Sequence, residues 1–170
     1  AIDDLANENM AKFNKQKAIV YNTFQLYRTD RLQYLNETIK QGKTQAYFVG
    51  AKLVRGAYME KERERAKAMG YPSPIQTTKE DSDKDYNAAL KLCVDNHDIV
   101  SVCAGTHNEK SSQLLLELMK AKNISASDHN FYFSQLLGMS DHISYNLSSE
   151  GYNVAKYVPY GPLKDVMPYL

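Results

Sequence analysis

Short apolar runs alternate with longer amphipathic stretches along most of the chain. The runs are rich in β-branched and aromatic residues and predict five strands, at 18–24, 46–56, 99–104, 131–135 and 153–159. The stretches carry apolar residues three or four positions apart and predict helices, at 30–41, 59–69, 82–96, 109–121, around 139–149 and from Pro162 onward. Strands that alternate with helices in this way indicate parallel βαβ units.

Two architectures fit this alternation. One is an open doubly wound α/β sheet of about this size. The other is part of a (β/α)8 barrel, which takes roughly 250 residues when complete. Both place ligands at the loops that follow the carboxyl ends of the strands. Those loops are FQLYRTD, RGAYME, GTHNE, QLLGMSD and YVPYGP, and candidate chemistry is expected there.

Composition removes several classes of function. The 170 residues carry 21 basic and 20 acidic side chains, which gives no reason to expect a nucleic-acid partner. The two cysteines form no Cys-x-x-Cys motif and the four histidines show no metal-ligand spacing, so neither a disulfide framework nor a metal site is expected. No apolar run approaches the roughly 18 residues of a membrane-spanning helix. The absence of a Gly-x-Gly-x-x-Gly fingerprint and of a P-loop disfavours a Rossmann or P-loop site.

The stretch AKLVRGAYMEKER places two charges inside a predicted strand. Lys52 and Arg55 flank the strand formers Leu53 and Val54, and a charge buried there costs several kcal/mol unless it has a partner. Either these side chains leave the core for water at the strand's end, or they hold an anionic ligand. Backbone N–H groups at a glycine turn that opens a helix, as at Gly56, suit a phosphate.

The GTHNE loop also has two interpretations. Thr106 with Glu109 three residues later fits a capping box before an apolar helix. Alternatively, Thr106 and His107 hydrogen-bond a ligand above the strand. Near the end of the sequence, Tyr157 and Tyr169 are of a type that walls a pocket for a small organic molecule.

Two helical patterns are interpreted as structural. The charged run MEKERERAK predicts a solvated helix face with neighbouring ion pairs such as Glu60 with Arg63, and we assign it no chemistry. Tyr86, Leu90 and Val94 are four residues apart, which predicts a buried stripe on the helix at 82–96.

The loop motifs, taken together, are similar to those of a known family. KLVRGAYMEKER, GTHNE, QLLGMSD and KYVPYGPLKDVMPYL occur in this order and spacing in the proline dehydrogenases, FAD-dependent enzymes built on a (β/α)8 TIM barrel. The resemblance runs from about AIVYNTFQLYR to the last residue and favours the barrel over the open sheet. Met59 stands where the bifunctional branch usually has Trp, so the chain resembles the single-function branch.

The resemblance implies roles for particular residues. Lys52 matches a basic residue beside the flavin ring and is the implied catalytic residue. The residues implied to bind FAD are Asn22, Lys52, Arg55, Gly56, Ala57, Thr106, His107 and Asn108. The residues implied to line the proline pocket are Tyr58, Leu136, Tyr157 and Tyr169. Lys52 and Arg55 would then be tolerated in a strand because an anionic cofactor lies over them.

The implied reaction is hydride transfer from C5 of L-proline to N5 of FAD, which gives pyrroline-5-carboxylate. The family delivers its electrons to membrane quinone, so L-proline and a quinone are the implied partners. The implied location is the mitochondrion for a eukaryotic protein, and the cytoplasm or inner-membrane periphery for a bacterial one. Peripheral membrane association is in keeping with the resemblance. A homo-oligomer is expected for a different reason, because it would cover the strand edges that an incomplete barrel leaves open.

The chain departs from the family pattern in its number of units. A complete barrel has eight βα units, whereas the pattern here predicts five. We therefore expect residues 1–170 to be the C-terminal portion of a single barrel domain. The family's first three strands would precede Ala1, and its substrate-gripping arginine pair would follow Leu170. By itself such a fragment is expected to be inactive and to bind FAD weakly. The alternatives are a non-catalytic barrel fragment, a dehydrogenase of hydroxyproline and a phosphosugar-binding α/β protein.

Overall fold

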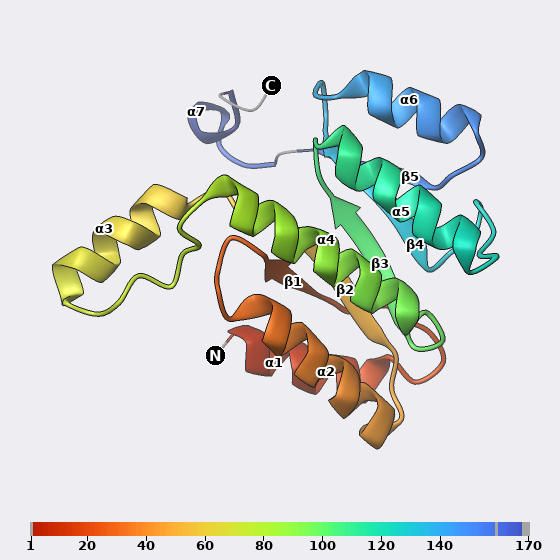
Figure 1. Ribbon diagram of the computed structural model, residues 1–170, viewed down its shortest axis with the longest axis horizontal. Coiled ribbons are helices and arrows are strands. Elements are labelled where there is room, and N and C mark those ends of the chain that lie inside the picture. Colours follow the sequence, from red (N-terminus) through yellow and green to blue (C-terminus); the bar gives the residue numbers. More distant parts are fainter. Residues whose placement is uncertain (1, 159, 168–170) are drawn as a thin grey trace.

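The computed structural model describes residues 2–158 and 160–167, apart from the side chain of Asp165. Within these ranges the chain forms five strands, β1 (Tyr21–Gln25), β2 (Val49–Val54), β3 (Val100–Gly105), β4 (Phe131–Leu136) and β5 (Val154–Tyr157). It also forms seven helices (Figure 1), α1 (Ile2–Phe13), α2 (Arg31–Gln45), α3 (Met59–Met69), α4 (Lys79–Asp95), α5 (Glu109–Ala121), α6 (Asp141–Ser149) and α7 (Leu163–Val166). Every predicted element is present, and α1 is an addition that the apolar pattern did not predict.

The strands form one parallel sheet in the order β1-β2-β3-β4-β5, so each strand pairs with the next along the chain. This order confirms the predicted βαβ units and excludes a doubly wound sheet, because such a sheet reverses its strand order at a switch point. In the register, Thr23 pairs with Lys52, and Lys52 pairs with Cys103. Partners in register share one face of a sheet, so these three side chains lie on the same side.

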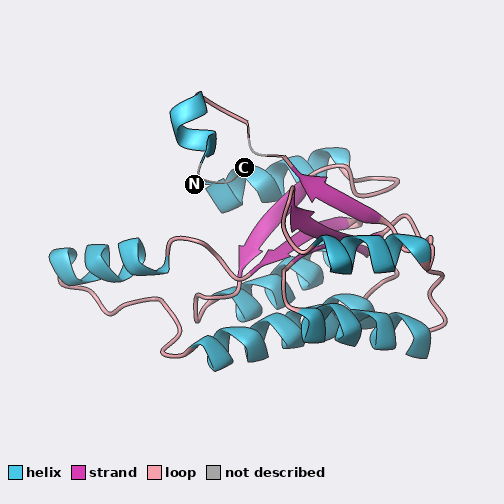
Figure 2. Cartoon of the chain, turned by 90° about the horizontal axis from the view of Figure 1, so that it is seen from above, coloured by secondary structure: helices cyan, strands magenta, loops and turns pink. Residues whose placement is uncertain are grey.

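The two faces of the sheet have opposite environments. Phe24, Leu53 and Val102 point to one face and are completely buried. In Figure 1, α2, α4 and α5 lie in front of the strands, and Figure 2 shows helices gathered on one side of the sheet. Tyr21 and Tyr132 point to the other face and are each 36% exposed. The sheet therefore has one face covered by helices and one face that the described residues leave open.

Helix α4 illustrates how the sequence fixes the covering layer. Thr78 and Asp81 form a capping box at its first turn, in which the Thr78 side chain accepts from the Asp81 N–H and the Asp81 carboxylate accepts from the Thr78 N–H. The predicted stripe of Tyr86, Leu90 and Val94 is completely buried, which confirms the helical period.

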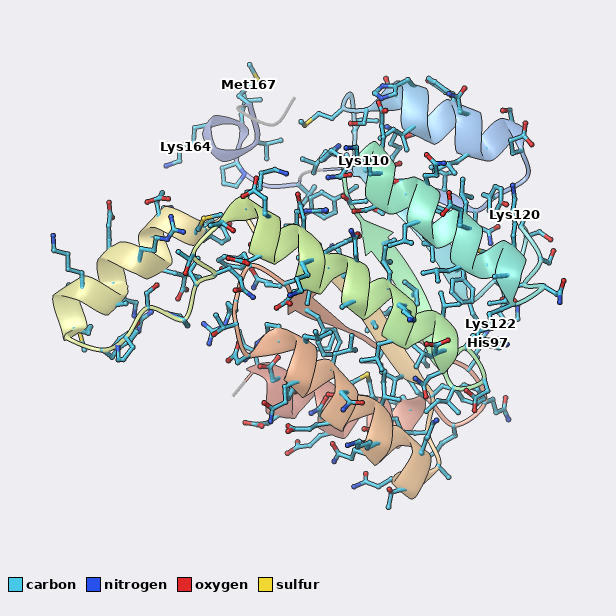
Figure 3. All side chains as sticks on the ribbon, in the orientation of Figure 1. His97, Lys110, Lys120, Lys122, Lys164 and Met167 are labelled. Atoms are coloured by element: carbon cyan, nitrogen blue, oxygen red, sulfur yellow. The ribbon has the colours of Figure 1, made fainter. Side chains whose placement is uncertain are left out.

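An ion pair joins the carboxyl ends of α4 and α5. Lys122, which follows α5, pairs with Asp95, the last residue of α4, at 3.0 Å, and Figure 3 shows Lys122 at this end.

A buried asparagine joins α1 to the sheet. Asn14 is completely buried, and its amide donates to the carbonyls of Val20 and Phe48, each at 2.8 Å. Its side-chain oxygen accepts from the N–H groups of Ile19 and Val20. These four bonds satisfy backbone groups where the chain enters β1 and β2, so Asn14 fixes both strand entries at once.

Helices α3 and α7 stand apart from the layers in Figure 1. Ala66 is the single buried residue of α3, and Glu60 pairs with Arg63 at 3.0 Å, which confirms the predicted solvated face. Leu163 of α7 and Met167, which follows the last residue of that helix, are mostly exposed. Among the described helices, none combines the length and the apolar character that crossing a membrane requires.

Candidate functional site: a cationic cavity at the carboxyl ends of the strands

A cavity of about 860 Å³ opens at the carboxyl ends of the strands, where both candidate architectures place ligands. Ten of the predicted site residues line it: Lys52, Arg55, Gly56, Ala57, Tyr58, Thr106, His107, Asn108, Leu136 and Tyr157. Seven further residues line it that the sequence analysis did not select: Thr23, Gln25, Val54, Lys79, Gly105, Ser134 and Gln135. Segments distant in the sequence are thus brought into one wall, and the volume lies within the range of ligand pockets.

Lys52 projects from the open face of the sheet into this cavity. Its ammonium group lies 5.0 Å from the centre of the Tyr157 ring, a distance at which a cation is attracted to an aromatic face. Its neighbour in register is Cys103, whose pKa is raised because burial outweighs the opposing effect of the Lys52 charge. Among the carboxylate side chains that the structure describes, none forms an ion pair with Lys52.

Arg55 has a different environment, although it lies only three residues away. Its Nε donates to Asp83 at 2.5 Å, and its other two nitrogens donate to Thr106 at 2.7 Å and Ser111 at 2.9 Å. The guanidinium also lies 4.3 Å from the centre of the Tyr86 ring. Arg55 therefore has an anionic partner within the chain, a possibility that the sequence analysis did not consider.

Asp83 is shared between two cations of the cavity wall. It accepts from Lys79 at 2.7 Å as well as from Arg55. Burial raises the pKa of Asp83, but the hydrogen bonds from Lys79 and Arg55 and their charges outweigh burial, so its pKa lies below its ordinary value. Asp83 is consequently ionised at neutral pH. The spacing of Lys79 and Asp83, four apart at the start of α4, was the available signal for this pair.

Asn22 does not lie in the cavity, so the structure does not support its predicted contact with the flavin. It is only 5% exposed, on the covered face of β1, and its amide donates to Asp3 of α1 at 3.0 Å. Its partner in register is Ala51, not Lys52. Because side chains alternate between the faces of a strand, Thr23 and Gln25 are the residues of β1 that reach the cavity.

The GTHNE loop has a cap at a different residue from the one predicted. The N-cap of α5 is Asn108, whose side chain accepts from the Ser111 N–H at 3.1 Å. Thr106 instead accepts from the Asn108 N–H and from Arg55, so the predicted capping box of Thr106 with Glu109 was wrong. Thr106 is nearly buried and supports the cavity wall.

His107 links this loop to the one after β4. Its Nδ1 lies 2.9 Å from the Ser140 hydroxyl. Burial, helped by the nearby charge of Lys156, lowers the pKa of His107, so the ring is neutral at neutral pH and offers both a donor and an acceptor. His107 can therefore hydrogen-bond a ligand with one nitrogen while Ser140 holds the other.

The predicted substrate residues form the aromatic and apolar part of the wall. Tyr58 and Tyr157 are 54% and 52% exposed, and Leu136 is half-buried. Exposed tyrosines in a cavity offer ring faces and hydroxyl groups to a small ligand. Tyr169 lies outside the described residues.

Comparisons with known proteins agree with one another. The family model described as proline dehydrogenase matches residues 1–170. Proline dehydrogenase 1, mitochondrial, from Drosophila melanogaster is 41% identical over 100% of this chain and 26% of that protein. The human protein of the same name is 39% identical over 100% of this chain and 29% of its own length. The chain thus spans less than a third of either relative.

Among solved structures, proline utilization A from Bdellovibrio bacteriovorus, inactivated by N-propargylglycine, superimposes with a TM-score of 0.90. It shares 24% sequence identity and covers 99% of this chain and 17% of its own. This likeness confirms the predicted fold, a (β/α)8-type α/β barrel of which the chain supplies five strands. With the match to the family model over its whole length, the chain belongs to the proline dehydrogenase family.

Proposed function

We propose that this chain forms part of the active site of a flavoenzyme that oxidises L-proline to pyrroline-5-carboxylate. The observation that supports this best is the charge of the cavity. Three cationic side chains, Lys52, Arg55 and Lys79, line it, and none of its described lining residues is a carboxylate. Asp83, outside the wall, compensates one of these charges. The positive charge that remains attracts an anionic ligand, and the family membership makes FAD the first candidate.

The residues of the cavity fit the chemistry of FAD. A diphosphate is best held by cations and by backbone N–H groups at a helix start. Arg55 and Lys79 supply the cations, and the turn at Gly56 and Ala57, just before α3, supplies the N–H groups. Uncharged polar side chains such as Gln25 and Asn108 are available for the other polar atoms of the cofactor.

Each residue then has a role that follows from its position. FAD, when bound, would supply the redox chemistry by accepting a hydride at N5 from C5 of proline. Lys52 would stabilise negative charge that accumulates on the cofactor, since its own charge has no carboxylate partner among the described residues. Tyr58, Leu136 and Tyr157 would enclose the apolar ring of proline.

Partners and location follow the same proposal. A quinone would receive the electrons, and contact with a membrane surface would bring the two together. The matching relatives from Drosophila melanogaster and Homo sapiens are named mitochondrial, so we propose a mitochondrial location if the source is eukaryotic. We expect slower turnover of hydroxyproline than of L-proline, because the Tyr157 phenol would crowd a ring hydroxyl.

The direct test is a visible absorption spectrum of protein expressed from its complete gene, recorded before and after anaerobic addition of L-proline. A flavin band that bleaches with L-proline is the expected result. Protein that carries no flavin, or a flavin that L-proline leaves oxidised, would overturn the proposal.

Lys52→Met tests the assigned role of the lysine. We expect a loss of about 10²-fold or more in the rate of proline-dependent flavin reduction, in line with the removal of one charge-stabilising group. The free energy of unfolding should change little, because Lys52 has no ion pair among the described residues. Lys91→Met, an exposed lysine on α4, is the matched control. Equal reduction rates for both variants would remove Lys52 from the mechanism.

A further inference from the structure

One carboxylate holds both cations at the α4 edge of the cavity. Asp83 accepts hydrogen bonds from Arg55 and from Lys79. Arg55 and Lys79 line the cavity, whereas Asp83 does not. Asp83 therefore contacts the two cations from outside the cavity wall, where it competes little with a ligand inside.

The guanidinium of Arg55 is held by three hydrogen bonds at its edges and by an aromatic ring against its face. Asp83, Thr106 and Ser111 each accept one of its hydrogen bonds, and the Tyr86 ring lies against its face. An arginine side chain that is free in water loses rotamer entropy when it binds a ligand. In this arrangement most of that freedom is already lost before a ligand arrives.

Donors remain for a ligand after these contacts are made. A guanidinium has five N–H donors and an ammonium has three. Arg55 uses three of its donors in the described contacts, and Lys79 uses one. The Lys79 side chain is 70% exposed, so its remaining donors face solvent.

We propose that Asp83 is a positioning residue that presents Arg55 and Lys79 to the diphosphate of the cofactor. This inference rests on the proposed function. The positioning role and simple electrostatics predict opposite changes in the affinity for FAD when the charge of Asp83 is removed. Removing a carboxylate makes the cavity edge more positive, which by charge alone would tighten the binding of an anion. If Asp83 acts by positioning, removing its charge weakens binding.

The experiment is a fluorescence titration of FAD into apoprotein expressed from its complete gene. Asp83→Asn keeps the size of the side chain and removes its charge, and we expect its FAD dissociation constant to rise about tenfold or more, as for the loss of hydrogen bonds to a charged group. The matched control is Asp85→Asn, which removes the same charge from the same helix. Asp85 bonds to Gln76 at 2.6 Å, away from Arg55 and Lys79, so the control should bind FAD as the wild type does.

A double-mutant cycle separates positioning from general damage to the fold. If Asp83 acts partly through Lys79, Asp83→Asn should weaken FAD binding less in a Lys79→Met background than in the wild type. Urea unfolding of each apoprotein supplies the stability comparison. General damage would instead give the same loss in both backgrounds and would refute the inference.

The possible failures are distinguishable. Wild-type protein that does not bind FAD would overturn the proposed function itself. Wild-type protein that binds FAD, with Asp83→Asn binding equally well or more tightly, would refute the positioning role and leave the function standing. Equal losses in Asp83→Asn and Asp85→Asn would also refute it. An Asp83→Asn protein too unstable to fold would show that the residue is required for folding, not for positioning.

Discussion

Gly56 is a position where one added methyl group should have a large effect. Its φ is +122°, a conformation that side-chain-bearing residues rarely adopt. A Cβ placed there would lie 2.9 Å from Cγ of the Tyr27 ring and closer still to Cδ1 and Cε1, whereas carbon atoms in contact lie about 3.5–4.0 Å apart. Tyr27 is only 2% exposed, so its ring cannot move aside without disturbing its neighbours.

The cost of Gly56→Ala follows from these two terms. Backbone strain at such a φ costs about 1–3 kcal/mol, and forcing an extra methyl group into packed surroundings costs about 1–3 kcal/mol. The sum, about 2–6 kcal/mol, is a large part of the roughly 5–15 kcal/mol that stabilises a typical folded protein. Because Gly56 lies between Arg55 and Ala57 in the cavity wall, we also expect weaker binding of FAD.

Urea unfolding measures the first effect, and a matched glycine isolates its cause. Gly70 also has a positive φ, +71°, but a Cβ there would meet nothing within 4 Å. Gly70→Ala should therefore show backbone strain alone, about 1–2 kcal/mol. The combination of Gly56→Ala with Tyr27→Ala should cost less than the sum of the two single changes, because the clash is removed. A loss no greater for Gly56→Ala than for Gly70→Ala would refute the clash.

Two further predictions concern stability away from the cavity. Asn14→Leu should lower the free energy of unfolding by about 2–5 kcal/mol, since it leaves buried backbone groups without partners. Urea unfolding tests this, with Asn9→Leu as the control because the partly buried Asn9 donates only one hydrogen bond, at the surface of α1. Equal losses would contradict the prediction. The hydrogen bond from Arg31, aided by Arg28, outweighs burial and holds the pKa of Asp30 well below its ordinary value of 3.8. Its stabilisation should therefore be fully present above pH 3.8 and lost as the pH falls toward the lower folded value. Asp30→Asn should flatten this part of the pH dependence of unfolding, and an unchanged slope would show that other carboxylates control it.

The alternation of strands and helices was predictable because burial follows the period of each element. Leu53 and Val102 lie on the face of the sheet that the helices cover, and both are completely buried. The positions of apolar residues along the sequence therefore show which face of each strand is covered. Helix α1 was not predicted although Ile2, Leu5, Met10 and Phe13 recur at helical spacing, and of these apolar residues Met10 alone is buried. Its attachment depends instead on Asn14, whose role is visible only when its four partners are known.

The predicted site residues that belong to continuous motifs lie together in the structure, whereas the one predicted on the first strand does not lie with them. Ten motif residues line the cavity, but Asn22, which the resemblance implied to bind FAD, lies on the covered face of β1. Side chains alternate between the two faces of a strand, and Lys52 pairs with Thr23, not with Asn22. Asn22 therefore points away from the face that carries Lys52. The partner of Arg55 was beyond a single sequence, because Asp83 lies 28 residues away on a helix whose rotation depends on packing.

We expect substitutions at Lys52 and at Arg55 to have different effects, although both residues are cations at the end of β2. The charge of Arg55 is compensated inside the chain by Asp83, and its side chain is held at fixed points. Lys52 faces the open side of the sheet, and its recorded contact is the ring of Tyr157. Lys52 should therefore supply most of the charge that stabilises an anionic ligand, and Arg55 should mainly fix the position of that ligand.

On this reasoning, substitution of Lys52 should reduce the rate of flavin reduction more than the affinity for FAD, whereas disruption of the Asp83 contacts should reduce affinity more than rate. The reverse assignment in the same two measurements would mean that the internal ion pair does not distinguish the two cations.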